Sequence, residues 1–180
     1  MSTIDPHSPE RRAALIRAAR RLTAEAGPDV GALLDPELAA DVASGLSEDI
    51  AAEIDRRAAG VTTLDELVDA LVDGVLEGAA PWRETLQLAN VASEHVTDFE
   101  RWTGMLAPWL DAVERTIAAG QATGVVRDDV DPRPTALVLR DALDRTAKVE
   151  IRFKRDGYRD ATAALVRAAL APDKASAATE

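Results

Sequence analysis

The sequence has no cysteine and only two histidines among its 180 residues. The absence of cysteine excludes disulfides, cysteine nucleophiles and zinc sites built on thiolates. The two histidines, His7 and His95, are too few for a multi-histidine metal centre. We therefore expect the protein to hold neither a metal nor another cofactor.

Basic residues are also scarce, because 21 lysines and arginines stand against 32 aspartates and glutamates, for a formal net charge of -11. This balance argues against a general nucleic-acid binder, whose phosphate contacts need a basic surface. The N-terminus carries Asp5 and lacks the basic-then-apolar pattern of a signal peptide. No stretch approaches the ~18 uncharged apolar residues of a membrane span. We expect a soluble, cytoplasmic protein with no membrane partner.

Aromatic residues make up only 3% of the chain, and all six follow residue 80. Between Leu22 and Asp55 there is no lysine or arginine, whereas nine residues are acidic. The first half is therefore aliphatic and acidic. We expect the bulky core, or a pocket, in the second half.

Alanine is abundant and runs of β-branched residues are rare, which favours helix along nearly the whole chain. Capping signals predict seven or eight helices, which begin at or near Pro9, Pro36, Thr63, Pro81, Asp98, Pro132 and Gly157. We expect the second helix to end near Ala59 and the fourth near His95. The helix from Asp98 should bend at Pro108, and the next should extend to about Phe153. No segment predicts a strand, so the expected fold class is all-α.

In the second half, a long helix, a glycine stop and an Asp-Pro helix start follow one another. Residues 109–124 read WLDAVERTIAAGQATG, residues 125–132 read VVRDDVDP, and residues 135–139 read TALVL. With these motifs, the stretch from about 63 to 171 resembles the ligand-binding domain of TetR-family transcriptional regulators. The resemblance implies a TetR-like helical bundle that binds a small hydrophobic effector, forms a homodimer and acts in transcriptional regulation.

The N-terminal part resembles the same family less completely. Residues 13–27, AALIRAARRLTAEAG, look like the opening helix of the family's DNA-binding domain. The helix-turn-helix that should follow is missing, and about thirty residues of the usual module are absent. We therefore divide the chain into shortened N-terminal helices (1–60), a ligand-binding and dimerisation domain (61–172) and a flexible tail (173–180).

The one window that could serve as a recognition helix, residues 46–54, carries Glu48, Asp49 and Glu53. A recognition helix donates basic or amide side chains to base edges, and carboxylates are repelled by the phosphates. The residues thus argue against autonomous DNA binding, although the resemblance implies it. A conventional repressor with a divergent helix-turn-helix stays open as the alternative.

Two predicted helices carry aromatic and apolar residues at helical spacing, where the resembled family encloses its effector. The candidate ligand-binding residues are Trp82, Leu86 and Asn90 on one helix and Trp102, Met105 and Trp109 on the next. Apolar walls with a few polar groups suit a small hydrophobic ligand. Plain core packing explains the same stripe equally well.

The last two predicted helices carry apolar stripes among mixed charges, which suits a moderately polar homodimer interface. The resemblance places the interface there, and the candidate residues are Leu139, Leu143, Ala147, Ile151, Leu165, Val166 and Ala169. The alternative is a monomer whose stripe packs internally. A heterodimer with a full-length relative is a further alternative.

No catalytic motif accompanies the titratable residues. His95, with Glu94 and Asp98 nearby in the sequence, could serve in acid–base chemistry only with a positioned partner and a cleft. We therefore predict a regulatory protein and not an enzyme. A ligand-sequestering protein or an enzyme on the same fold is the alternative from another class.

Overall fold

The structure is a computed structural model, and it describes residues 9–26, 36–83, 85–86, 99–154 and 156–172. Within these ranges the chain is helical and contains no strand, so the all-α prediction is confirmed. The six α-helices are α1 (Pro9–Ala26), α3 (Pro36–Ala58), α4 (Leu64–Ala79), α6 (Phe99–Ala122), α7 (Pro132–Ala147) and α8 (Tyr158–Leu170). A 3-10 turn, η2 (Ala80–Trp82), follows α4, and a π-helical turn, η3 (Lys148–Arg152), follows α7.

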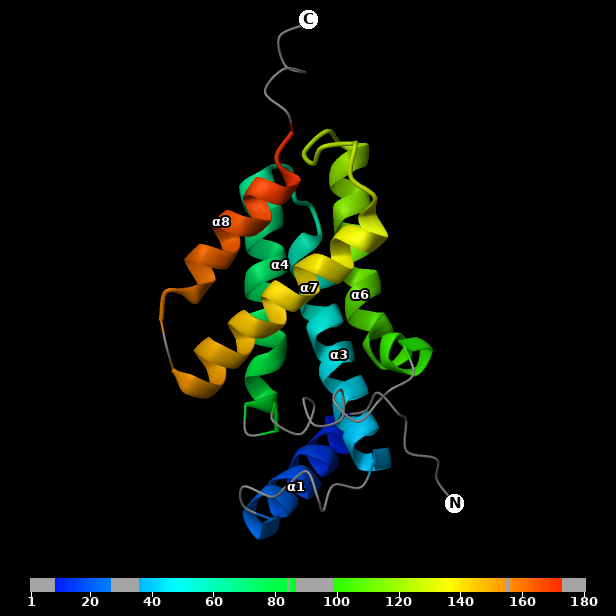
Figure 1. Cartoon of the computed structure of the whole chain (residues 1–180), viewed down its shortest axis with the longest axis vertical. Coiled ribbons are helices and arrows are strands. Elements are labelled where there is room, and N and C mark those ends of the chain that lie inside the picture. Colours follow the sequence, from blue (N-terminus) through cyan, green and yellow to red (C-terminus); the bar gives the residue numbers. More distant parts are fainter. Residues whose placement is uncertain (1–8, 27–35, 84, 87–98, 155, 173–180) are drawn as a thin grey trace, which may run out of the picture.

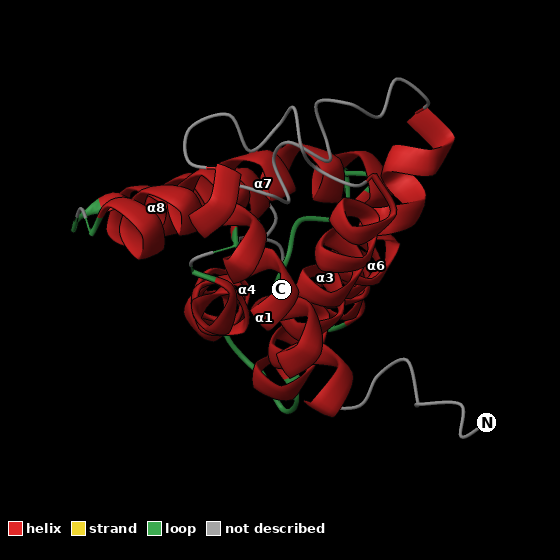
Figure 2. Cartoon of the chain, turned by 90° about the horizontal axis from the view of Figure 1, so that it is seen from below, coloured by secondary structure: helices red, strands yellow, loops and turns green. Residues whose placement is uncertain are grey.

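Helices α3, α4 and α6 run side by side, and α7 crosses the bundle (Figure 1). Helix α8 packs on α4, and α1 packs on α3 near Gly45. Figure 2 shows the same helices from below. One apolar core extends from Ala19 on α1 to Leu170 on α8. Residues on both sides of position 60 therefore contribute to the same core, and α3 is an integral part of the bundle.

Small residues on α4 let its backbone approach α3 closely. A Cβ atom built at Gly78 would lie 2.6 Å from the Cα of Ile50, and one built at Gly74 would lie 2.8 Å from Cγ1 of Ile54. Gly74 and Gly78 are four residues apart, so both lie on the face of α4 that contacts α3. Only glycine fits at this contact, because the atoms opposite include backbone.

The predicted start of α4 is confirmed in atomic detail. The Thr63 hydroxyl accepts the backbone N–H of Glu66 at 3.2 Å, and the Glu66 carboxylate accepts the backbone N–H of Thr63 at 3.1 Å. This reciprocal capping box satisfies two N–H groups that have no partner inside the helix. The sequence signal therefore fixes where α4 begins.

The helix predicted to continue to about Phe153 does so, but its α-helical part ends at Ala147 and the rest is the π-helical turn η3. The wider turn keeps Ile151 in the core and places Glu150 where its carboxylate accepts the backbone N–H of Arg159 at the start of α8. The helix from Pro81 is described only as η2, and most of its predicted length lies outside the described residues. In the described part of the chain, a helical element starts at or next to each of the predicted positions.

Two arginines bind helix α8 to α4: Arg167 donates to Asp65 at 2.7 Å, and Arg159 makes the larger set of contacts. The Arg159 guanidinium donates to Asp73 at 2.7 and 2.8 Å and to Asp69 at 2.8 Å. The Asp73 carboxylate, above all, raises the pKa of Arg159 above its ordinary value. These charge-assisted hydrogen bonds fix the orientation of α8, although exposed pairs of this kind contribute little stability.

A second set of ion pairs connects α3 and α4. Glu53 accepts hydrogen bonds from Arg56 and Arg57 on its own helix, and Arg57 also reaches Glu77 on α4 at 2.5 Å. The hydrogen bond from Arg56, with help from Arg57, lowers the pKa of Glu53 from 4.5 to about 2. The ionised carboxylate is therefore favoured in the folded chain.

This depressed pKa predicts a specific acid sensitivity. The carboxylate of Glu53 stabilises the fold fully above its unfolded pKa of 4.5, and the contribution is lost as the pH falls toward about 2. Glu53→Gln cannot ionise, so its deficit in unfolding free energy should shrink by about 1 kcal/mol between about pH 6 and about pH 2.5, allowing for solvent screening. Urea denaturation of both proteins across this range measures the difference. A deficit that stays constant would contradict the assignment.

Candidate functional site

The candidate site lies around the proline in α6. Pro108 stands inside this helix, and the first turns of α6 lie at an angle to the rest (Figure 1). Proline lacks an N–H and its ring collides with the preceding turn, which bends a helix. The next backbone N–H, that of Trp109, donates to the buried hydroxyl of Ser47 on α3 at 3.1 Å. The bend is thereby tied to α3.

The indole of Trp109 is buried, with 2% of the residue exposed. The guanidinium carbon of Arg140, on α7, lies 5.4 Å from the centre of a Trp109 ring, within reach of a cation–π contact. Arg140 is itself buried and donates to Asp141 at 2.7 Å. The indole Nε1–H of Trp109 has no acceptor among the described residues. Buried donors normally have a partner, so this N–H is an exception within the core.

The second tryptophan of the site has its partner within the chain. Trp82 is completely buried, and its indole Nε1–H donates to the carboxylate of Asp49 on α3 at 2.8 Å. The turn after α4 is held by Thr85, whose backbone N–H and hydroxyl both donate to the Trp82 carbonyl. Trp82 therefore connects the end of α4 to α3.

The structure places the predicted ligand-binding residues as follows. Trp82, Leu86 and Trp109 share the buried core, and Met105 is also buried. Trp102 lies in the first turn of α6 with its side chain outside the described part, and Asn90 falls outside the described residues. His95, Glu94 and Asp98 fall outside them as well.

Sequence reasoning missed Ser47 and Arg140. A signal for Arg140 was available, because it lies four residues after Ala136 and beside Leu139, on the apolar side of α7. A charged residue on an apolar stripe needs a specific partner. Trp109 is that partner in the structure. The sequence could not identify it, because the contact depends on how α6 and α7 cross.

The predicted dimer residues are mostly covered within the single chain. Leu139, Leu143, Ala147, Ile151 and Val166 are buried in its own core, and Ala169 is half-buried against it. Leu165, with 54% exposed, points outward. We call these buried residues of α7, η3 and α8 the inner stripe. They pack inside the chain, so a partner could contact only the outward-facing surface of α7 and α8.

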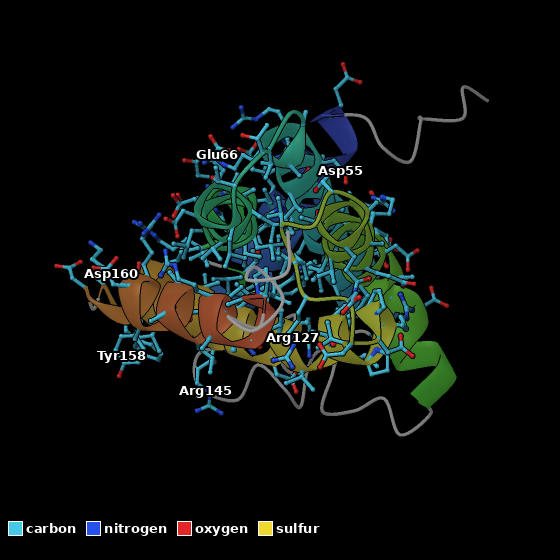
Figure 3. The ribbon with its side chains drawn as sticks, turned by 90° about the horizontal axis from the view of Figure 1, so that it is seen from above. Asp55, Glu66, Arg127, Arg145, Tyr158 and Asp160 are labelled. Carbon is cyan, nitrogen blue, oxygen red and sulfur yellow. The ribbon has the colours of Figure 1, made fainter. Side chains whose placement is uncertain are left out.

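That outer surface carries exposed apolar side chains. Over the described residues, the large hydrophobic side chains that are exposed are Val138, Phe153, Tyr158 and Leu165, all on α7, α8 or the segment between them. Tyr158 and Arg145 point away from the bundle on the same side (Figure 3). On α8 the exposed residues at helical spacing are Tyr158, Ala161, Leu165 and Ala168. We call the surface formed by these residues and Val138 the outer face.

The window 46–54 lies inside α3 and contributes to the core. Leu46, Ile50 and Ile54 are buried, and Ser47 and Asp49 bond to the tryptophans. Glu53 is held by arginines of the same helix. This helix packs against both α4 and α6, so the window is not presented as a free surface.

A separate pocket lies between the α3–α4 turn and the end of α6. These two segments are at the end of the bundle away from α1 (Figure 1). Its volume is about 210 Å³. It is lined by Ala58, Gly60, Val61, Leu67, Thr116, Ala119, Gly120, Thr123 and Val125. The lining includes no ionisable side chain.

The described residues contain no cluster of three or more histidine or acidic residues placed to hold a metal ion. None of the helices in these ranges combines the length and the hydropathy that crossing a membrane requires.

No protein-family model and no curated protein sequence matches the chain. The chain is similar to a solved structure of a protein of unknown function from Rhodococcus sp. RHA1, with a TM-score of 0.63 and 17% sequence identity. The match covers 92% of this chain and 97% of that one. At this identity the likeness establishes a shared all-helical fold alone.

Proposed function

We propose that the protein is a TetR-like regulatory homodimer that binds a small hydrophobic molecule beside Trp109 and does not bind DNA on its own. The observation that carries the proposal is the buried indole N–H of Trp109, which has no acceptor among the described residues. A ligand with an apolar body and one acceptor oxygen would satisfy this donor. Leu86 and Met105 supply buried apolar surface in the same part of the fold.

The position of this donor supports a regulatory role. Trp109 is bonded through its backbone to Ser47 of α3, and α1 packs on α3. A ligand beside Trp109 would therefore bind next to the hydrogen bond that connects α6 to α3, and α3 in turn contacts α1. Such a ligand shifts their orientation only if its affinity differs between two arrangements of the chain.

The outer face supports a homodimer. Exposed apolar side chains at helical spacing are typical of a surface that a partner covers. In a two-fold dimer the same surface serves both subunits, so the outer face of α7 and α8 would pack on its own copy.

The burial of α3 in the core argues against DNA binding by the protein alone. A recognition helix needs a free face with donors for base edges. In α3 the central residues are buried and its carboxylates accept hydrogen bonds from Trp82, Arg56 and Arg57. We therefore propose regulation through ligand or partner binding.

The experiment is native mass spectrometry of the purified protein. We expect twice the chain mass together with a retained small molecule. Trp109→Phe preserves the apolar ring but removes the N–H, so it should weaken binding of that molecule about tenfold, the value of one hydrogen bond to a buried donor. Titration of the released molecule into both proteins measures the ratio.

Tyr158→Phe is the matched control, because it removes a polar hydrogen from an exposed aromatic residue on α8. This variant should bind as the wild type does. Equal affinity in the wild type and in Trp109→Phe would refute the role of the indole N–H. Sequence-selective retention of DNA by the protein alone would refute the proposed lack of DNA binding.

A further inference from the structure

We propose that the pocket between the α3–α4 turn and the end of α6 is a second binding site, for an uncharged apolar molecule such as a single aromatic ring. It includes the α3–α4 turn, at the start of α4, whereas η2 and Trp82 follow the other end of that helix. The inference is therefore independent of the function proposed above.

The pocket is large enough to hold one aromatic ring. A volume of about 210 Å³ exceeds the roughly 150 Å³ of an apolar cavity that binds benzene. A substituted single ring therefore fits the available space.

The walls present mainly carbon to an occupant. The Thr116 hydroxyl donates to the Ala112 carbonyl at 2.8 Å, and the Thr123 hydroxyl donates to carbonyls of its own helix at 3.2 Å. These two hydroxyls are thus already engaged in donating. The other lining residues are aliphatic or glycine, so no lining side chain offers a free donor, and an apolar occupant is favoured.

The walls are also fixed before any ligand binds. A Cβ atom at Gly120 would lie 2.7 Å from Leu67 and 2.6 Å from Val126, so these segments already touch. The Gly120 carbonyl accepts the backbone N–H groups of both Val125 and Val126. On the other wall, the N–H of Val61 donates to Ala58 before the capping box starts α4. Preformed walls reduce the ordering that binding requires.

The test uses benzene as the probe and methyl NMR as the measurement. The methyl signals of Val61, Leu67 and Val125 should shift saturably, whereas those of the exposed Val138 should not. Ala119 lines the pocket and is exposed, so it lies at the rim. Ala119→Phe should therefore weaken benzene binding at least about tenfold.

Ala118→Phe is the matched control, because Ala118 is the exposed neighbour on the same helix and does not line the pocket. It should bind benzene as the wild type does. If Ala119→Phe does not fold, Thr116→Met fills the pocket from its buried side and should give the same loss. Shifts that do not saturate, or that persist unchanged when the pocket is filled, would overturn the proposal.

Discussion

Gly78→Val should lower the free energy of unfolding by about 3 kcal/mol, because it places a branched side chain where α3 and α4 touch. Even the first added atom would lie 2.6 Å from the Cα of Ile50 and 2.9 Å from the Asp49 carbonyl oxygen. Both are backbone atoms, so no side-chain rotation can relieve the contact. The helices would have to separate, and the buried apolar residues between them would lose contacts. Chemical denaturation monitored by circular dichroism measures the loss.

Gly104→Ala provides the control. Gly104 also lies inside a helix, but a Cβ atom built there meets nothing within 4 Å. Alanine should therefore raise the unfolding free energy by about 0.5–1 kcal/mol through helix propensity alone. If Gly78→Val were as stable as the wild type, the close approach of α3 and α4 would be wrong.

The second large effect concerns the outer face of α7 and α8. Leu165→Glu should raise the dissociation constant of the proposed homodimer at least about 100-fold, because two-fold symmetry places the new charge in the interface twice. Leu165 is 54% exposed in the single chain, so the substitution leaves the core intact. Analytical ultracentrifugation over a concentration series measures the constant, and circular dichroism checks the fold.

Ala52→Glu is the appropriate control, because Ala52 is also exposed but lies on α3 and not on the outer face. It adds the same charge to the protein and should leave association nearly unchanged. A wild-type protein that stays monomeric at high concentration would contradict the homodimer directly. Equal weakening by both variants would assign the effect to net charge and not to the outer face.

The helix boundaries could be predicted from sequence because local chemistry determines them. Asp131 accepts the N–H of Arg133 as the N-cap of α7, as the Asp-Pro pair indicated. The Thr63 capping box starts α4, and Pro36 starts α3. In each case the deciding interaction lies within a few residues of the signal.

The contacts between helices could not be predicted in the same way. Periodicity identifies the stripe that contains Leu139 and Leu143, but it does not say whether that stripe meets the chain itself or a second copy. The structure shows both residues buried in the chain's own core. The partners of Trp82 and Trp109 likewise come from Asp49, Ser47 and Arg140, which are distant in the sequence. The way in which the helices cross determines these contacts, and no local sequence pattern predicts how they cross.

Because the inner stripe of α7 and α8 is covered within one copy, the hydrophobic core of a subunit is complete before any partner arrives. An obligate dimer, in contrast, has no stable folded monomer. Each subunit of the proposed dimer can therefore leave and rejoin as a folded unit. Another chain with a matching outer face could take its place by simple exchange, at a rate set by dissociation and not by unfolding.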